Sequence, residues 1–130
     1  MAQYIDGFVF PIPSDRLDEY QSIAQAVANI WKEHGALDYC EYVGDDMVRG
    51  GTRAFNDLVT ASANESVVFG WVVFKSRESH ARVNEKVAAD PRMVDLIEPL
   101  VEKPNPIFDA KRMAYGGFLP LVRSSGANAG

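Results

Sequence analysis

Two polar side chains set among apolar residues, Asp6 and His80, are the strongest candidates for acid–base chemistry in this sequence. Asp6 interrupts the apolar segment YIDGFVF, where a buried carboxylate must find partners or raise its pKa. In a cleft it would act as a general base. Alternatively it forms a structural ion pair with Arg112 or Lys111, which we favour because structural pairs also perturb pKa values.

His80 is the second catalytic candidate, and Asn84 follows it by one helical turn, beside Val83 and Val87. Both side chains could line a cleft and orient a polar group of a ligand, with His80 as acid or base near neutral pH. The alternative is an exposed helix edge, or a histidine whose hydrogen bonds serve the structure alone.

Aromatic residues on the expected central strands suggest where a ligand would pack. Trp71, Phe69 and Tyr115, together with Met113, could form an apolar pocket. More often such residues belong to the core or to a dimer interface. The two interpretations are compatible, because pockets often lie at such boundaries.

The sequence predicts no metal site and no cofactor. The two histidines, His34 and His80, are far apart, and no HxH, HxxxH or CxxC motif is present. A phosphate-binding loop and a GxGxxG fingerprint are also missing. Cys40 is the single cysteine, so no internal disulfide can form, and a buried thiol is the expected state.

Composition excludes several classes of protein. The chain has 130 residues with 47% hydrophobic residues, which suits one domain over residues 1–123 followed by a flexible polar tail at 124–130. A net charge of −5 argues against nucleic acid as a partner. The longest apolar run, 67–74, is too short to cross a membrane, and no signal peptide is recognisable, so we expect a cytoplasmic protein.

Residue periodicity predicts alternating strands and helices. Ser14 is the expected cap of the first helix, Gly35 ends it, and Ser76 caps the second long helix. Prolines are expected to end the first strand after Phe10 and a short helix before Pro99. The expected strands are 4–10, 37–43, 67–74 and 111–122, and the expected helices are 14–34, a short one after Thr52, 76–89 and 92–97.

This order predicts an α+β fold of the ferredoxin-like βαββαβ type, a four-stranded antiparallel sheet with its helices on one face. Strand 67–74 is apolar on both faces, so the face away from the helices needs a cover. We predict a homodimer in which two sheets pack face to face. Alternatively, the long connection at 44–65 and the C-terminal segment fold over that face.

The segments YIDGFVFPIP, KEHGALDYCEYVGDD, ESVVFGWVVFKSRESHARVNEKVAADPR and FDAKRMAYGGFLPLV together resemble a bacterial family of small proteins with a domain of unknown function. Some of its members carry a name referring to the RNA of the signal recognition particle. The resemblance covers residues 4–122. It implies a protomer of the dimeric α/β-barrel superfamily, in which many members use the cleft between sheet and helices.

Together these observations predict a dimer that binds a small apolar or mixed ligand, or a cofactor-independent enzyme, with its site in that cleft. The alternative is a non-catalytic structural or interaction protein that uses the sheet only to dimerise. Whether the protein is an enzyme stays open at this point, since fold analogy is a weak argument for function.

Overall fold

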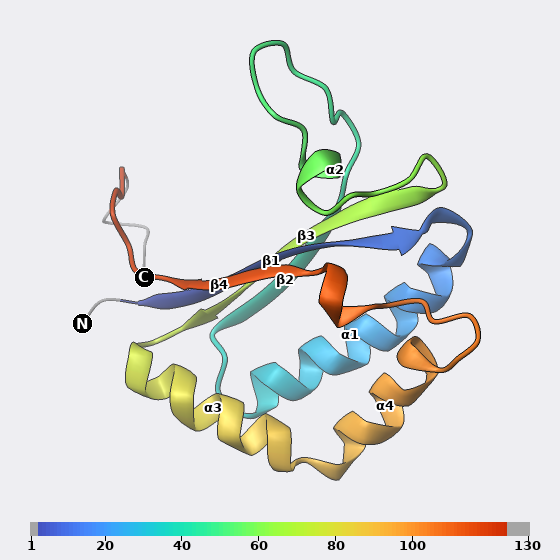
Figure 1. The fold of residues 1–130 in the computed structure, drawn as a ribbon. Coiled ribbons are helices and arrows are strands. Elements are labelled where there is room, and N and C mark those ends of the chain that lie inside the picture. The colour runs from blue at the N-terminus through green and yellow to red at the C-terminus, as the bar shows by residue number, and fades with distance from the viewer. Residues whose placement is uncertain (1–2, 125–130) are drawn as a thin grey trace.

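A four-stranded antiparallel sheet forms the centre of the computed structural model, which describes residues 3–124 (Figure 1). Its strands are β1 (Tyr4–Pro13), β2 (Asp38–Val43), β3 (Glu65–Phe74) and β4 (Ala114–Phe118), in the order β2-β3-β1-β4. The first and third strands are central, as the sequence predicts. The ferredoxin-like α+β fold is therefore confirmed. The expected tail lies, apart from Ser124, outside the described residues.

Three helices lie on one face of this sheet: α1 (Leu17–Glu33), α3 (Arg77–Ala89) and α4 (Pro91–Val101). Figure 1 shows them together below the strands, with the short helix α2 (Phe55–Leu58) on the opposite side. None of the helices described between residues 3 and 124 has both the length and the apolar character needed to cross a bilayer.

The main core fills the space between the sheet and these three helices. Alternation along β1 sends Asp6, Phe8 and Phe10 toward the helices, whereas Ile5, Gly7 and Val9 face away. One buried cluster lies near α1 and α4, and a second lies near α3. The first contains Phe10, Ile12, Tyr20, Val68, Leu100 and Ile107, and the second contains Ala36, Val72, Phe74, Val83 and Val87.

Several predicted element boundaries are wrong, and β1 gives the clearest reason. It continues past Phe10 to Pro13, pairing Pro11 with Val67 and Pro13 with Glu65. Beyond Val9 the neighbouring strand β4 no longer pairs with it, so β1 has a described strand on one side only. Proline has no backbone N–H to donate. Because no described strand pairs with β1 on its other side there, Pro11 and Pro13 are tolerated as they would be at a sheet edge.

The helix ends also differ from expectation. Ser14 does not cap α1; it starts a 3-10 turn, and its hydroxyl lies 2.8 Å from that of Ser66. Helix α4 continues through the exposed Pro99 to Val101, and the residue after the proline, Leu100, is buried in the core. Ser76 does cap α3, accepting a hydrogen bond from the Ser79 backbone at 3.1 Å.

The sheet face opposite the long helices is only partly covered. The connection that contains α2 packs Val59 against Val9 and Val67, so one end of this face is buried. Toward the other end, Tyr42 stacks on Trp71 with ring centroids 5.4 Å apart, and Tyr42 and Phe118 remain 61% and 54% exposed. The connection at 44–65 therefore covers one end of this sheet face, as the alternative prediction has it, but it leaves a large aromatic area exposed to solvent.

Candidate functional site

Asp6 is the buried centre of a polar network beneath the sheet. Its side chain is 4% exposed, and one oxygen, Oδ1, lies 3.0 Å from His80 Nε2 and 2.7 Å from the Tyr115 hydroxyl. An ionised carboxylate only accepts hydrogen bonds, so in this contact His80 Nε2 is the donor. No hydrogen bond from the described residues reaches the second oxygen, Oδ2.

The partners of Asp6 are set by the fold. β1 and β4 pair Asp6 with Gly117 and Phe8 with Tyr115, which brings Tyr115 diagonally next to Asp6. The His80 ring packs against Tyr4 and Phe74, with centroids 4.8 Å away in each case. Burial and the hydrogen bond to Asp6 raise the pKa of Tyr115, so its hydroxyl stays a donor at neutral pH.

The expected ion pair between Asp6 and Arg112 is wrong. Arg112 instead makes two hydrogen bonds of 2.7 Å to Glu65, at the far end of β3, and a third of 2.8 Å to the Thr60 carbonyl. The pairing follows from register, because Arg112 precedes the start of β4 whereas Asp6 pairs with Gly117 near its end. Lys111 is exposed.

A cleft of about 360 Å³ lies between the sheet and the helices, and Asp6, Asn84 and Tyr115 belong to its lining. Its walls are mostly apolar, with a large share of aromatic rings: Phe8, Phe10, Trp31, Tyr39, Val72 and Phe108 among others. Asn84 donates to the His80 carbonyl at 2.8 Å, which fixes its amide one turn along α3. Of the predicted residues, the structure thus brings together Asp6, His80, Asn84 and Tyr115.

The other two predicted ligand-binding residues, Trp71 and Phe69, do not line this cleft. Trp71 pairs with Gly7 and Phe69 with Val9, on the face of the sheet that points away from the long helices. Phe69 contacts the Phe55 ring of α2 at a centroid distance of 5.6 Å. Their positions suit the interface interpretation that the sequence also allows.

A second carboxylate in the cleft, Glu41 of β2, was missed by sequence reasoning. Its Oε1 accepts the Tyr20 hydroxyl at 2.5 Å and its Oε2 accepts the Tyr39 hydroxyl at 3.0 Å. Burial raises the pKa of Glu41, and the two tyrosine hydrogen bonds oppose that rise. Alternation places Glu41 on the same strand face as Tyr39, and this pattern in the sequence could have indicated that Glu41 faces the cleft.

An adjoining groove of about 390 Å³ runs between α1 and the edge strand β2. It shares Tyr20, Ala24, Tyr39 and Glu41 with the cleft, so the Glu41 cluster lies where the two spaces meet. The groove is also lined by Asp18 and by the glutamines Gln21 and Gln25.

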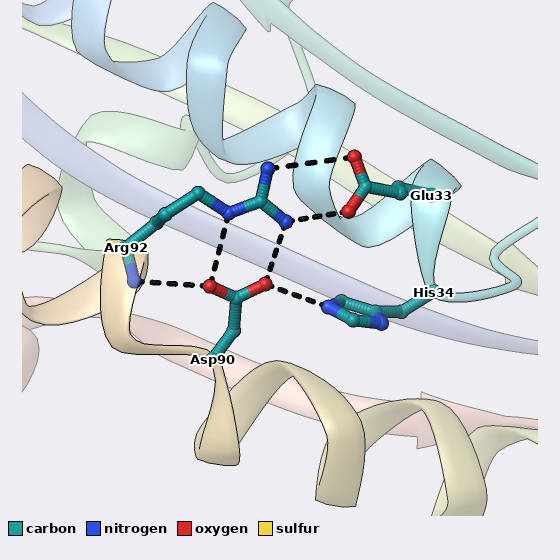
Figure 2. Close-up of polar contacts among 4 residues, drawn as sticks. All are labelled: Glu33, His34, Asp90 and Arg92. Carbon is teal, nitrogen blue, oxygen red and sulfur yellow. Dashed lines mark hydrogen bonds and ion pairs between the residues drawn. The ribbon is translucent and has the colours of Figure 1, made fainter.

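A separate polar cluster joins the end of α1 to the start of α4 (Figure 2). Glu33, His34 and Asp90 offer possible metal-binding atoms within 4.8 Å of one another. Arg92 already occupies the space between the carboxylates, at 2.5 Å from Glu33 and 2.7 Å from Asp90, and His34 lies 2.8 Å from Asp90. The cluster is therefore an ion-paired helix junction.

Fold and site together define a ferredoxin-like α+β domain with an acidic, aromatic cleft between its sheet and its helices. The chain belongs to the family described as "Protein of unknown function (DUF1428)", which matches residues 3–106. The "Uncharacterized protein YbaA" of Escherichia coli K12 is 38% identical over 120 residues, covering 92% of this chain and 97% of that protein. The protein of the same name from Shigella flexneri has the same identity and coverage.

The fold has a solved counterpart in a NIPSNAP family protein of unknown function from Agrobacterium tumefaciens. The TM-score is 0.53 with 14% identity, covering 91% of this chain and 87% of that chain. Identity at this level reports on the fold alone. The family of unknown function and the ferredoxin-like protomer expected from the resemblance are thus confirmed. The dimeric barrel and the expectation that nucleic acid is not a partner stay predictions.

Proposed function

We propose that this protein binds a small organic molecule in the cleft between the sheet and helices α1, α3 and α4. The observation that carries the proposal is a space of about 360 Å³ that combines apolar walls with the buried carboxylate of Asp6. Ligand sites typically pair a mostly apolar lining with a few convergent polar groups. A purely structural protein would fill this space with side chains.

Asp6 is the group proposed to contact the ligand. Its Oδ1 is held by His80 and Tyr115, which leaves Oδ2 to accept a hydrogen bond or a proton from a molecule in the cleft. His80 is then a positioning residue, because it acts through Asp6 and is not among the residues lining the cleft. Asn84 also lines the cleft, with its amide held against the His80 backbone carbonyl.

Binding of the neutral fluorophore N-phenyl-1-naphthylamine tests the proposal. We expect its fluorescence to rise with one site per chain. Ala24→Phe should abolish the rise, because Ala24 lines the cleft and a ring there would fill it. Ala81→Phe, at an exposed position of α3, is the matched control and should bind normally. Unchanged binding by folded Ala24→Phe, or no binding by the parent protein, would overturn the proposal.

We also propose that a second copy of the chain covers the open part of the opposite sheet face. That area includes Tyr42, Phe69, Trp71 and Phe118, and Phe69 is 43% exposed. Asp38 is the one charged residue that the strand segments 5–9, 38–42, 67–73 and 114–118 place on this face. A face with so few charged residues can meet its own copy across a two-fold axis with little charge repulsion.

Sedimentation velocity tests the dimer. The parent protein should sediment at twice the chain mass at micromolar concentration, and Phe69→Lys should reduce it to the mass of one chain. Val94→Lys, at a 66% exposed position on α4, is the matched control and should remain a dimer. A parent protein of one chain mass would refute the proposal.

A further inference from the structure

The charged side chains lining the cleft and its adjoining groove are all acidic. Asp6 and Glu41 line the cleft, and Glu41 and Asp18 line the groove, whereas neither lining includes a lysine, an arginine or a histidine. His80 is outside this lining and contacts Asp6 at Oδ1 only. A ligand in this space therefore meets carboxylates that no lysine or arginine of the lining neutralises.

Asp6 offers one of its carboxylate oxygens to the cleft. Its side chain is 96% buried, yet both of its described hydrogen bonds fall on the same oxygen. Among the described residues, Asn56 Oδ1 is the one fully buried side-chain polar atom without a partner, so Oδ2 of Asp6 keeps access to the cleft. Oδ2 is therefore the oxygen that can accept a hydrogen bond from a molecule in the cleft.

The tyrosines around Glu41 increase the acceptor character of the cleft. Tyr20 and Tyr39 each donate their only hydroxyl proton to Glu41. Burial, followed by the charge of Glu41, raises the pKa of both tyrosines, so they remain protonated donors to that carboxylate. Their phenol oxygens can then only accept from a ligand.

The register places both carboxylates on one side of the sheet. Asp6 pairs with Val72 and Glu41 with Gly70, so the two residues are two strands and two positions apart, about 12 Å between Cα atoms for ordinary strand spacing. The rings of Phe8 and Tyr39 lie 6.3 Å apart between them, and Trp31 lies a further 6.3 Å from Tyr39. Aromatic faces of this kind attract cations.

Given the proposed cleft, we infer that its ligand is an organic amine, an ammonium group on an apolar body. The ammonium would donate to Asp6 Oδ2 or to Glu41, and the apolar body would pack against Phe8, Phe10 and Trp31. Charge-assisted hydrogen bonds and aromatic faces would then select the cation over neutral and anionic molecules of the same shape.

Three probes of nearly equal size separate this inference from the proposed function: 2-phenylethylamine, 2-phenylethanol and 3-phenylpropionate. Each is titrated at pH 7 against the parent protein, by calorimetry and by displacement of bound N-phenyl-1-naphthylamine. We expect the amine to bind about tenfold more tightly than the alcohol, and the carboxylate to bind most weakly.

Charge-neutral variants then locate the effect. Asp6→Asn and Glu41→Gln should each reduce the preference for the amine over the alcohol, and together they should abolish it. Glu85→Gln removes one exposed negative charge from α3 and should leave the preference unchanged. Circular dichroism checks that each variant folds. If Asp6→Asn does not fold, Glu41→Gln alone tests the inference.

The outcomes are distinguishable. Equal binding of amine and alcohol by the parent protein, or an amine preference that survives both substitutions, would overturn the inference while cleft binding stands. Displacement of the fluorophore by none of the three probes would also count against it. Failure of the fluorophore itself to bind would instead overturn the proposed function.

Discussion

Asp6 in β1 and His80 in α3 are hydrogen-bonded at 3.0 Å although 74 positions separate them in the chain. The contact joins helix α3 to strand β1 at a residue that lines the cleft. It also uses the same oxygen that accepts the Tyr115 hydroxyl, so two donors from different elements converge on one atom. This convergence holds the carboxylate in place, and no residue between 3 and 124 donates a hydrogen bond to its other oxygen.

The first prediction concerns the coupling between Asp6 and Tyr115. Tyr115→Phe removes one donor to the carboxylate and should lower the free energy of unfolding by about 1 kcal/mol. In an Asp6→Asn background the same substitution should cost clearly less, because the acceptor is no longer charged. Urea unfolding of the four proteins measures this as a double-mutant cycle. Equal costs in both backgrounds would show that the charge of Asp6 does not strengthen this hydrogen bond.

A second prediction follows from the close approach of Phe8 to Gly70. A Cβ atom at position 70 would lie 2.6 Å from Phe8 Cε1 and 2.7 Å from the Cys40 carbonyl oxygen. Gly70→Ala should therefore destabilise the protein by about 1–3 kcal/mol, since backbone must shift to make room. Gly50→Ala is the matched control, because nothing lies within 4 Å of the added atom. Thermal unfolding should show a lower Tm for the first variant alone.

The third prediction is a pH dependence from Glu65. Its two hydrogen bonds to Arg112 lower the pKa of Glu65 to about 2 in the folded protein, against an ordinary value of 4.5. The pair therefore stabilises the fold fully above about pH 4.5, and this contribution is lost as the pH falls toward 2. Because Arg112 is partly exposed, we expect only about 1 kcal/mol.

Glu65→Gln tests that expectation. Its free energy of unfolding, measured in urea, should fall below that of the parent protein at pH 6, and the two should converge near pH 2. Asp57→Asn, an exposed substitution on α2, serves as the control and should follow the parent protein throughout. A constant difference from pH 6 to pH 2 would contradict the assignment to Glu65.

A fourth prediction concerns the helix junction of Figure 2. Asp90 accepts the backbone N–H of Arg92 at 2.9 Å, which caps α4, and it also pairs with Arg92 and His34. These contacts, chiefly the Arg92 side chain, hold the pKa of Asp90 well below its usual range. Asp90→Ala should lower the Tm more than Glu33→Gln, which breaks only one of the exposed pairs. The reverse order would refute the capping role.

Much of the fold could be predicted from local patterns. The alternation in 67–74 and the three- and four-residue spacing in the first helix depend on neighbours along the chain, so they are readable without tertiary information. Strand ends were less predictable. Pro11 and Pro13 stay in β1 because β4 stops pairing at Val9, and nothing near those prolines in the sequence indicates where a strand 100 positions away ends.

The candidate site could be predicted only in part, for the same reason. Asp6, His80 and Tyr115 stand out as polar or aromatic residues in their own segments, but their mutual contacts depend on register. The preferred partner for Asp6, Arg112, lies at the other end of β4 and pairs with Glu65. Glu41 was missed because a glutamate on an edge strand looks solvent-exposed until α1 covers it with Tyr20.

By itself the sequence determined the order of strands and helices, the two central strands and the residues that share each strand face. Alternation decides which side chains point the same way, but it does not say which way that is. Only the tertiary structure decided that Asp6 and Glu41 face the helices whereas Phe69 and Trp71 face away. The reason is physical: helix packing selects one face of the sheet, and strand register selects which distant residues meet there.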